Sequence, residues 1–261
     1  MPQIGLGTWQ NKDPDTCAES VETALETGYR HIDTAQIYGN EEHVGRGIEN
    51  SEVDRDDVFL ATKVWIDKLG NDDVIESTEE SLEKLRTDYV DLLYVHWPAK
   101  DYDAEETLTA FNELHDEGRV ENIGVSNFTP EHLREAIEVS DAPVVANQVE
   151  THPLLQQTEM REVCGELDVD LVGYSPLARG RVFDVDVLSE IAEKHGVSEA
   201  QVSLAWLIEK DVHPIPKAST EEHILDNYGA LELELDDEDV DSIDSLDRES
   251  RMVDPKFSPD W

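Results

Sequence analysis

The chain alternates short apolar runs with amphipathic segments from one end to the other. Eight runs occur: "IGLGTW", "RHIDT", "VFLATKVW", "VDLLYVHW", "VENIGVSNF", "VVANQVE", "VDLVGYSP" and "VHPIPKAS". The segments between them have helical spacing, as at Cys17, Val21, Ala24 and Leu25. Such long connections predict parallel strands, because antiparallel hairpins need only short turns. Strands this apolar are buried on both faces.

A closed, parallel, eight-stranded (β/α)8 TIM barrel fits this number of strands and the length of 261 residues. We expect residues 1–261 to form one such domain, with one extra C-terminal helix inside 231–247 that turns Val240, Ile243 and Leu246 inward. The alternative is an open doubly wound sheet. No GxGxxG follows the first strand and no GxxxxGK[ST] occurs, which weakens that alternative. Residues 250–261, "SRMVDPKFSPDW", either fold over the barrel mouth or fray.

Local signals place several helix ends. Gly28 is expected to end the first helix, and Asn40, Asp72 and Thr129-Pro130 are expected to begin later ones. Met160, Val163, Cys164 and Leu167 have i, i+3, i+4, i+7 spacing and predict one helix face. The two cysteines, Cys17 and Cys164, are interpreted as small buried hydrophobic residues rather than a disulfide framework.

The charge is extreme. The chain has 62 acidic and 20 basic residues, a formal net charge of −42, and the acids are spread along its length. Nucleic acid is therefore not an expected partner, because phosphate contacts need a basic footprint. A dispersed acidic surface resembles the proteins of salt-loving microbes and predicts a halophilic protein, since salt shortens the range of self-repulsion. With no long apolar run and no signal peptide in the sequence, we expect no membrane partner and a cytoplasmic location.

Uncommon polar residues stand at the ends of the apolar runs. They are Asp33, Lys63, His96, Ser126, Asn127, Gln148, Tyr174, Ser175 and Lys217. In a (β/α)8 barrel these strand ends meet at one mouth, where such folds keep their chemistry. A single lysine at a strand end is usually solvated, but several such groups at one mouth predict a site.

Tyr38, five residues after Asp33, completes a candidate acid–base group. A phenol titrates near pH ~10 and is a poor acid at neutral pH. We expect the Lys63 ammonium to lower the pKa of Tyr38, Asp33 to hold Lys63 charged, and His96 to orient the oxygen that Tyr38 protonates. Such a group suits the protonation of a carbonyl oxygen while hydride reaches its carbon.

At these residues the chain resembles the aldo-keto reductase family. The motifs agree in order: "GLGTW", "DTAQIYGNE", "ATKVW", "VDLLYVHWP", "IGVSNF", "NQVETHP", "GYSPL" and "IPKAS". The resemblance is to short microbial reductases of aldehydes and 2,5-diketogluconate. It implies an NAD(P)H-dependent oxidoreductase that reduces aldehydes or ketones to alcohols. It also implies Tyr38 as proton donor with Lys63, Asp33 and His96. His96 argues against the family's steroid double-bond reductases, which carry glutamate there.

The resemblance also implies cofactor positions. Ser126, Asn127 and Gln148 would bind the nicotinamide carboxamide, and Tyr174 would stack beneath the ring. The remaining implied positions are Thr8 and Asp33, Ser175, Pro176 and Leu177 at the pyrophosphate, and Lys217, Ser219, Thr220, His223 and Asn227 at the adenosine end. Ala218 and His223 depart from the family, which often has serine and arginine there. Lys217 favours NADPH, whereas a mostly neutral His223 leaves NADH as an alternative.

Three tryptophans, Trp9, Trp65 and Trp97, follow strand ends and with His96 form the expected substrate pocket for a small-molecule carbonyl compound. Ordinary packing at the barrel rim is the other interpretation. No HExxH motif or Cys/His cluster predicts a metal. We expect a monomer. Two other functions stay open: a cofactor-sensing module with slow chemistry, and a cofactor-free isomerase or aldolase with Lys63 as a Schiff-base lysine.

Overall fold

The computed structural model describes residues 1–246 and 248–261, and in them eight parallel strands follow the chain order β1 to β8. The strands are β1 (Leu6–Gly7), β2 (His31–Asp33), β3 (Phe59–Val64), β4 (Leu92–Val95), β5 (Ile123–Ser126), β6 (Val144–Glu150), β7 (Asp170–Tyr174) and β8 (Val212–Pro214). The Gly5 amide donates to the Pro214 carbonyl and the Gly7 amide to the Pro216 carbonyl, each at 3.0 Å. These bonds close the sheet between β1 and β8. The predicted barrel is therefore confirmed and the open-sheet alternative is wrong.

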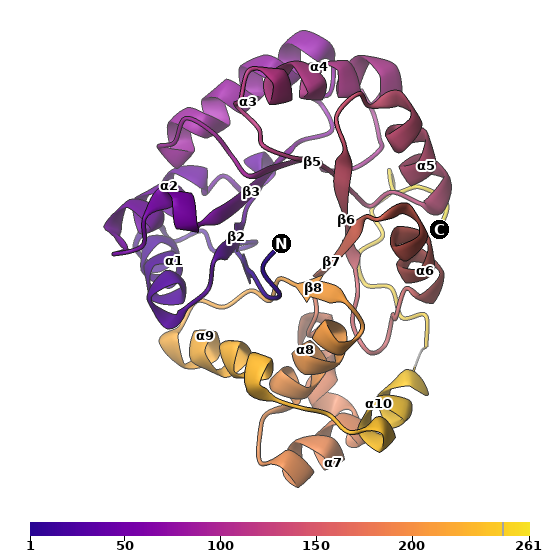
Figure 1. Cartoon of the computed structure of the whole chain (residues 1–261). Coiled ribbons are helices and arrows are strands. Elements are labelled where there is room, and N and C mark those ends of the chain that lie inside the picture. The colour runs from indigo at the N-terminus through magenta and orange to yellow at the C-terminus, as the bar shows by residue number, and fades with distance from the viewer. Residues whose placement is uncertain (247) are drawn as a thin grey trace.

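Helices surround the strands as an outer ring (Figure 1). In chain order they are α1 (Pro14–Thr27), α2 (Glu41–Asn50), α3 (Asn71–Leu85), α4 (Ala104–Asp116), α5 (Pro130–Val139), α6 (Thr158–Leu167), α7 (Asp186–His195), α8 (Glu199–Glu209), α9 (Glu221–Tyr228) and α10 (Asp237–Asp244). Helix α8 packs on β8, and α7 lies outside it beside α10. The predicted extra C-terminal helix is α10.

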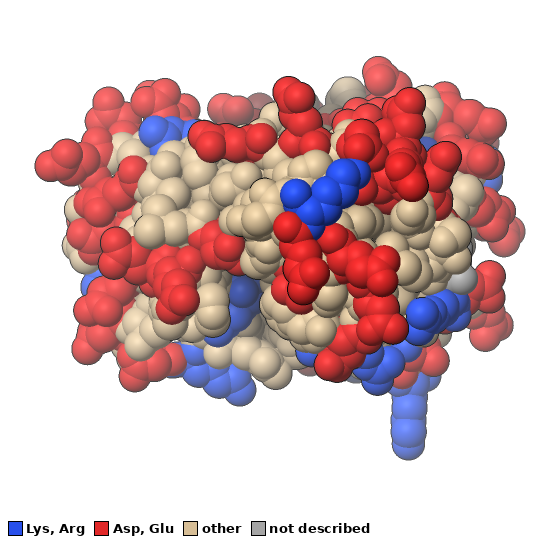
Figure 2. All heavy atoms as spheres, turned by 90° about the horizontal axis from the view of Figure 1, so that it is seen from below, with Lys and Arg blue, Asp and Glu red and all other residues tan. Residues whose placement is uncertain are grey.

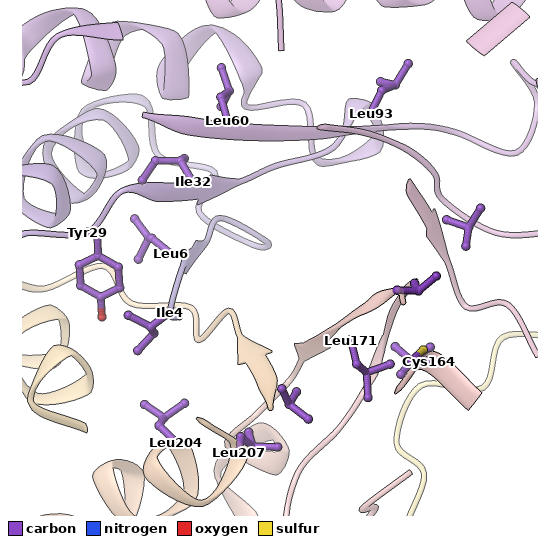
Figure 3. Packing of buried hydrophobic residues seen from close by; sticks show 14 of the residues in the cluster. Ile4, Leu6, Tyr29, Ile32, Leu60, Leu93, Cys164, Leu171, Leu204 and Leu207 are labelled. Carbon is purple, nitrogen blue, oxygen red and sulfur yellow. The ribbon is translucent and has the colours of Figure 1, made fainter. Parts of the chain in front are cut away.

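Successive side chains of each strand point to opposite sides of the barrel wall. The inward residues form a small apolar cluster of Ala61, Leu92, Tyr94, Ala146, Val172 and Ile215. The outward residues join the helices in a much larger cluster, in which Leu6, Ile32 and Leu60 leave the strands toward the surrounding layer (Figure 3). The barrel thus has two separate apolar regions, one inside the wall and one beneath the helices.

The predicted helix ends are mostly correct. The Thr129 hydroxyl accepts from the His132 amide at the start of α5, which is typically worth about 1 kcal/mol. Gly28 ends α1 with φ 125°, a conformation that favours glycine. Asn40 occupies the N-cap position of α2, but its side chain donates instead to the carbonyls of Thr8 and Asn11. Helix α3 begins at Asn71, one residue before the predicted Asp72.

The predicted burial in α6, α10 and the cysteines also holds. Met160, Val163 and Cys164 of α6 are buried, and Leu167 packs against the same core. Ile243 and Leu246 are buried and Val240 is partly buried. Residue 247, the last of the predicted 231–247 segment, lies outside the residues that the structure describes. Cys17 and Cys164 are buried and free, and burial raises their pKa values, to about 11 for Cys17 and about 12 for Cys164.

Acidic side chains cover much of the face seen from below in Figure 2, and basic side chains occupy fewer places. Several basic residues pair with the acids around them. Lys194 of α7, for example, reaches Asp236 at 2.6 Å and Asp239 at 2.7 Å, and so joins α7 to the start of α10. None of the helices in the described residues is both long and apolar enough to cross a membrane.

Close packing between α2 and α3 depends on a glycine. A Cβ on Gly45 would stand 2.5 Å from the Leu85 carbonyl oxygen, so we expect Gly45→Ala to lower the free energy of unfolding by about 1–3 kcal/mol. Gly165 of α6 is the matched control, because a Cβ there meets nothing within 4 Å. Gly165→Ala should instead raise the free energy of unfolding, by about 1 kcal/mol at most. Urea unfolding of both variants tests this, and two equal shifts would contradict the packing argument.

Candidate active site

Because side chains alternate between the two sides of each strand, the polar residues at the strand ends point into the barrel. Asp33, Lys63, His96, Gln148 and Tyr174 each stand two residues beyond an inward side chain, namely His31, Ala61, Tyr94, Ala146 and Val172. Each therefore points inward, one step nearer the C-terminal mouth than the apolar cluster. The barrel interior is apolar in its middle and polar at this end.

All of these residues except Lys63 line a cavity of about 680 Å³ at the mouth. The predicted site residues that line it are Trp9, Asp33, Tyr38, Trp65, His96, Trp97, Ser126, Asn127, Gln148, Tyr174, Ser175 and Lys217. The predicted residues outside its lining are Thr8, Lys63, Pro176, Leu177, Ser219, Thr220, His223 and Asn227. The expectation of one common mouth is thus met by the central residues, while the residues expected at the adenosine end, apart from Lys217, are not in the lining.

Lys63 and Asp33 form a fully buried ion pair beneath the cavity floor. The Lys63 ammonium donates to Asp33 Oδ1 at 2.5 Å and to the Thr34 carbonyl at 2.7 Å. Gln148 Nε2 donates to Asp33 Oδ2 at 2.8 Å. Burial raises the pKa of Asp33 and lowers the pKa of Lys63, and each charge opposes the effect on the other. The pair is stable only because the groups occur together with these hydrogen bonds.

Tyr38 lies above this pair at the end of a short 3₁₀ turn, Gln36–Tyr38. Gln36 fixes the turn, since its side chain accepts from the Trp65 amide and donates to the Ser77 carbonyl. The Lys63 ammonium stands 5.3 Å from the centre of the Tyr38 ring. The phenol and the ammonium are thus neighbours, as expected.

The expected direction of the Tyr38 pKa shift is wrong for this structure. Burial first, and then the Asp33 carboxylate and Tyr174, raise the pKa of Tyr38 well above its usual value. The Lys63 charge is matched by Asp33 at 2.5 Å, which leaves little net positive field at the phenol. Tyr38 therefore stays protonated at neutral pH, as a proton donor must.

His96 completes the group. Its ring centre lies 5.9 Å from that of Tyr38 and 5.0 Å from that of Trp65, with edge-to-face orientations. Burial, and secondly the charge of Lys63, lower the pKa of His96 well below its usual value, so the imidazole is neutral at pH 7. Its Nδ1 is buried without a hydrogen-bond partner in the part of the chain that the structure describes.

Beside these four residues, the cavity wall carries amide and hydroxyl groups next to an aromatic ring. The Tyr174 hydroxyl donates to Asn127 Oδ1 at 2.8 Å, and Asn127 Nδ2 donates to Ser126 Oγ at 3.0 Å. Asn127 has a positive φ of 63°, which turns its side chain to this wall. A flat ring bordered by donors and acceptors fits a planar aromatic carboxamide, so these residues are compatible with nicotinamide.

The expected adenosine end shows one polar pair at the surface. Lys217 Nζ donates to Ser219 Oγ at 3.0 Å, and Thr220 caps α9 by accepting from the His223 amide. Asn227 is buried within α9. Thr8 is also buried and donates to the Asp33 carbonyl, so its role in the structure is to hold the β1 and β2 loops together.

The C-terminal tail, residues 250–261, folds over the cavity mouth. Phe257 contacts Trp97 and Trp65 edge to face, with ring centres 5.5 and 5.9 Å apart. The sequence left open whether this tail folds over the mouth or frays, and the structure shows it folded over the mouth. The sequence reasoning missed the other cavity residues, which are Gly7, Gln10, Lys12, Ile37, Arg179, Ile215, Met252, Val253, Asp254, Pro255 and Phe257. The apolar residues of the tail were the one available signal.

Comparison with known proteins matches this geometry to a family. Residues 3–248 fit the model of the aldo/keto reductase family. The chain belongs to the aldo/keto reductase family. This confirms the family predicted from the ordered motifs, and with it an NAD(P)H-dependent reductase.

Named relatives resemble this aldo/keto reductase over nearly the full length of both chains. The chain is 42% identical to glyoxal reductase of Bacillus subtilis, covering 97% of this chain and 91% of the relative. It is 42% identical to methylglyoxal reductase DkgB of Escherichia coli O157:H7, covering 100% and 99%. The crystal structure of a Bombyx mori aldo-keto reductase in complex with NADP superimposes with a TM-score of 0.91, at 32% identity, over 97% and 92% of the two chains.

The buried ion pair is testable by removing one charge. We expect Asp33→Asn to lower the free energy of unfolding by about 3–5 kcal/mol, because it leaves the Lys63 ammonium buried without its counter-charge. Glu49→Gln is the matched control, since Glu49 pairs with Arg86 at the exposed surface and should change stability by less than about 0.5 kcal/mol. Urea unfolding measures both. Similar losses from the two variants would show that the pair is not a buried one.

Proposed function

We propose that this aldo/keto reductase reduces small aldehydes and ketones to alcohols with NADPH, using Tyr38 as the proton donor. The observation that carries the proposal is the convergence of Tyr38, His96 and the Lys63–Asp33 pair on one cavity. The relatives named as reductases of glyoxal and methylglyoxal support small carbonyl compounds as substrates. Trp9, Trp65 and Trp97 line the cavity and provide aromatic surface for the carbonyl compound.

Each of the four side chains has a role that follows from its state. Tyr38, protonated at neutral pH, donates its proton to the carbonyl oxygen as negative charge develops there. Neutral His96 donates an N–H to the same oxygen and orients it. Lys63 lies beneath the phenol and, because Asp33 offsets much of its charge, stabilises the phenolate that forms only in part. NADPH, when bound, supplies the hydride.

The cavity residues beside Tyr38 would hold that cofactor. Tyr174 provides the stacking surface, while Ser126, Asn127 and Gln148 provide hydrogen-bonding groups for the carboxamide. Ser175, Pro176 and Leu177 would border the pyrophosphate. Lys217, Ser219, Thr220, His223 and Asn227 would surround the adenosine end, where the Lys217 charge favours a 2′-phosphate and hence NADPH over NADH.

Replacement of the phenol tests the proposal. Tyr38→Phe should lower kcat at least about 100-fold with glyoxal or methylglyoxal, because phenylalanine has no proton to donate. NADPH binding, followed by quenching of tryptophan fluorescence, should be unchanged. Tyr89→Phe is the matched control, since Tyr89 contacts Asp56 at the surface, and should keep full activity. Full activity of Tyr38→Phe would remove Tyr38 from this role.

The same assay separates the other two functions. A wild-type protein that binds NADPH tightly but turns over no aldehyde, sugar or keto acid would be a cofactor sensor. A Schiff-base enzyme would be trapped on Lys63 by borohydride without cofactor. The structure opposes the latter, because Lys63 is fully buried and its ammonium bonds to Asp33 and Thr34.

We also propose that the protein is halophilic. Its net charge of −42 and its acidic surface imply strong self-repulsion, which is screened over about 3 Å in 1 M salt. The free energy of unfolding, measured by circular dichroism, should therefore be larger in 2 M than in 0.05 M KCl. Sucrose of equal osmolarity, which does not screen charge, should give a smaller gain. Equal stability in the two KCl concentrations would contradict the proposal.

A further inference from the structure

Glu150 is a buried carboxylate at the cavity mouth that the proposed chemistry does not use. It ends β6, two residues beyond Gln148, and therefore points to the same inner side of the wall. Its side chain is 0% exposed. A buried carboxylate without partners is strongly unfavourable, so the groups that bind it indicate what it does.

Four hydrogen bonds end on this carboxylate. The Met252 amide donates to both oxygens, at 2.9 and 3.0 Å, and the Val253 amide donates to Oε2 at 2.8 Å. His152 Nε2 lies 3.1 Å from Oε1. Burial raises the pKa of Glu150, but the bonds from His152 and the two amides outweigh it and hold the pKa below its usual value. The two oxygens of an ionised carboxylate can only accept hydrogen bonds, so they suit surrounding groups that donate them.

Two of these partners belong to the C-terminal tail. Beyond Ser250, whose amide donates to the Leu154 carbonyl, the hydrogen bonds from the described tail to the barrel all end on Glu150. The rest of the tail is held by aromatic contacts. Phe257 meets Trp65 and Trp97, and the ring centre of Trp261 lies 6.2 Å from that of Trp97.

The bound tail segment forms one wall of the cavity. Met252, Val253, Asp254, Pro255 and Phe257 all line it, and Phe257 reaches Trp65, whose ring also contacts His96. Hydrogen bonds to main-chain amides fix where the backbone runs, and so fix where Phe257 meets the two tryptophans. Without the carboxylate, this wall would depend on exposed ring contacts, since Phe257 is itself 37% exposed.

We propose that Glu150 is a positioning residue that sets substrate selectivity by holding the tail against the cavity. It favours carbonyl compounds with an apolar or aromatic group large enough to reach the Phe257 wall, and it has little effect on substrates too small to touch that wall. The inference rests on the proposed reductase function, because selectivity is read from carbonyl reduction. The positioning itself is measurable without turnover.

Glu150→Gln tests this in the full-length protein with 4-nitrobenzaldehyde and methylglyoxal as probes. Loss of charge-assisted bonds to two amides should raise KM for the aromatic aldehyde by about tenfold. KM for methylglyoxal, kcat for both substrates and NADPH affinity should stay within about twofold, since Tyr38, His96 and the cofactor positions are untouched. Trypsin should cleave faster after Arg251 and Lys256, which lie in the tail. A fall in kcat for both aldehydes with KM unchanged would overturn the proposal.

A double-substitution cycle shows whether Glu150 acts through the tail. Phe257→Ala alone should raise KM for the aromatic aldehyde, and adding Glu150→Gln should raise it little further, because both changes remove the same wall. Fully multiplicative effects would contradict the coupling. Val253→Pro deletes one amide donor from the tail side and leaves the barrel intact. It should give a smaller change in the same direction, so the test survives if Glu150→Gln fails to fold.

Failure of the inference is distinguishable from failure of the proposed function. If the wild-type protein reduces neither aldehyde, the function is wrong, yet the trypsin comparison still tests whether Glu150 holds the tail. If the wild type reduces both and Glu150→Gln keeps the same selectivity and the same cleavage rate, the reductase function stands and the role of Glu150 is wrong.

Discussion

The regular alternation of side chains across a closed barrel wall is the constraint on which the site depends. Inward residues in the middle of the strands are apolar and fill the interior, and the next inward residues toward the mouth are Asp33, Lys63, His96, Gln148 and Tyr174. Closure between β1 and β8 brings these strand ends around one cavity. Strand pairing therefore places most of the catalytic arrangement, whereas Tyr38 stands on the short turn after β2 that Gln36 fixes.

This placement imposes an energetic cost that the structure offsets locally. A lysine with 0% exposure is unfavourable, and the Asp33 carboxylate at 2.5 Å, together with the Thr34 carbonyl, compensates for its desolvation. Burial is the main reason that the phenol of Tyr38 keeps its proton, and the nearby Asp33 carboxylate adds to this effect. The protein thus separates two tasks: the buried pair provides a fixed field, and Tyr38 provides a proton. The acidic exterior, by contrast, has no such local pairing for most of its charge.

Much of this organisation is predictable from residues that are near one another in the chain. Periodicity gives the strands and helices, and strand-end position gives the cavity residues, since both depend on local spacing. The pKa of Tyr38 is not predictable in this way, because burial by distant segments decides it. The role of Asn40 was missed for the same reason, since its side chain serves the loop after β1 rather than its own helix. Glu150 stands in a quoted motif, yet its two partners in the tail lie 102 and 103 residues away.

The two-residue period of the strands also limits how such a protein changes over evolutionary time. One residue inserted inside β3, ahead of Lys63, would turn that lysine outward into the layer under α3 and away from Asp33. The loops after the strands do not depend on this two-residue alternation, so insertions there leave the side chains of the strands in place. New specificities are therefore expected to arise by lengthening and reshaping loops and termini around an unchanging frame of strands.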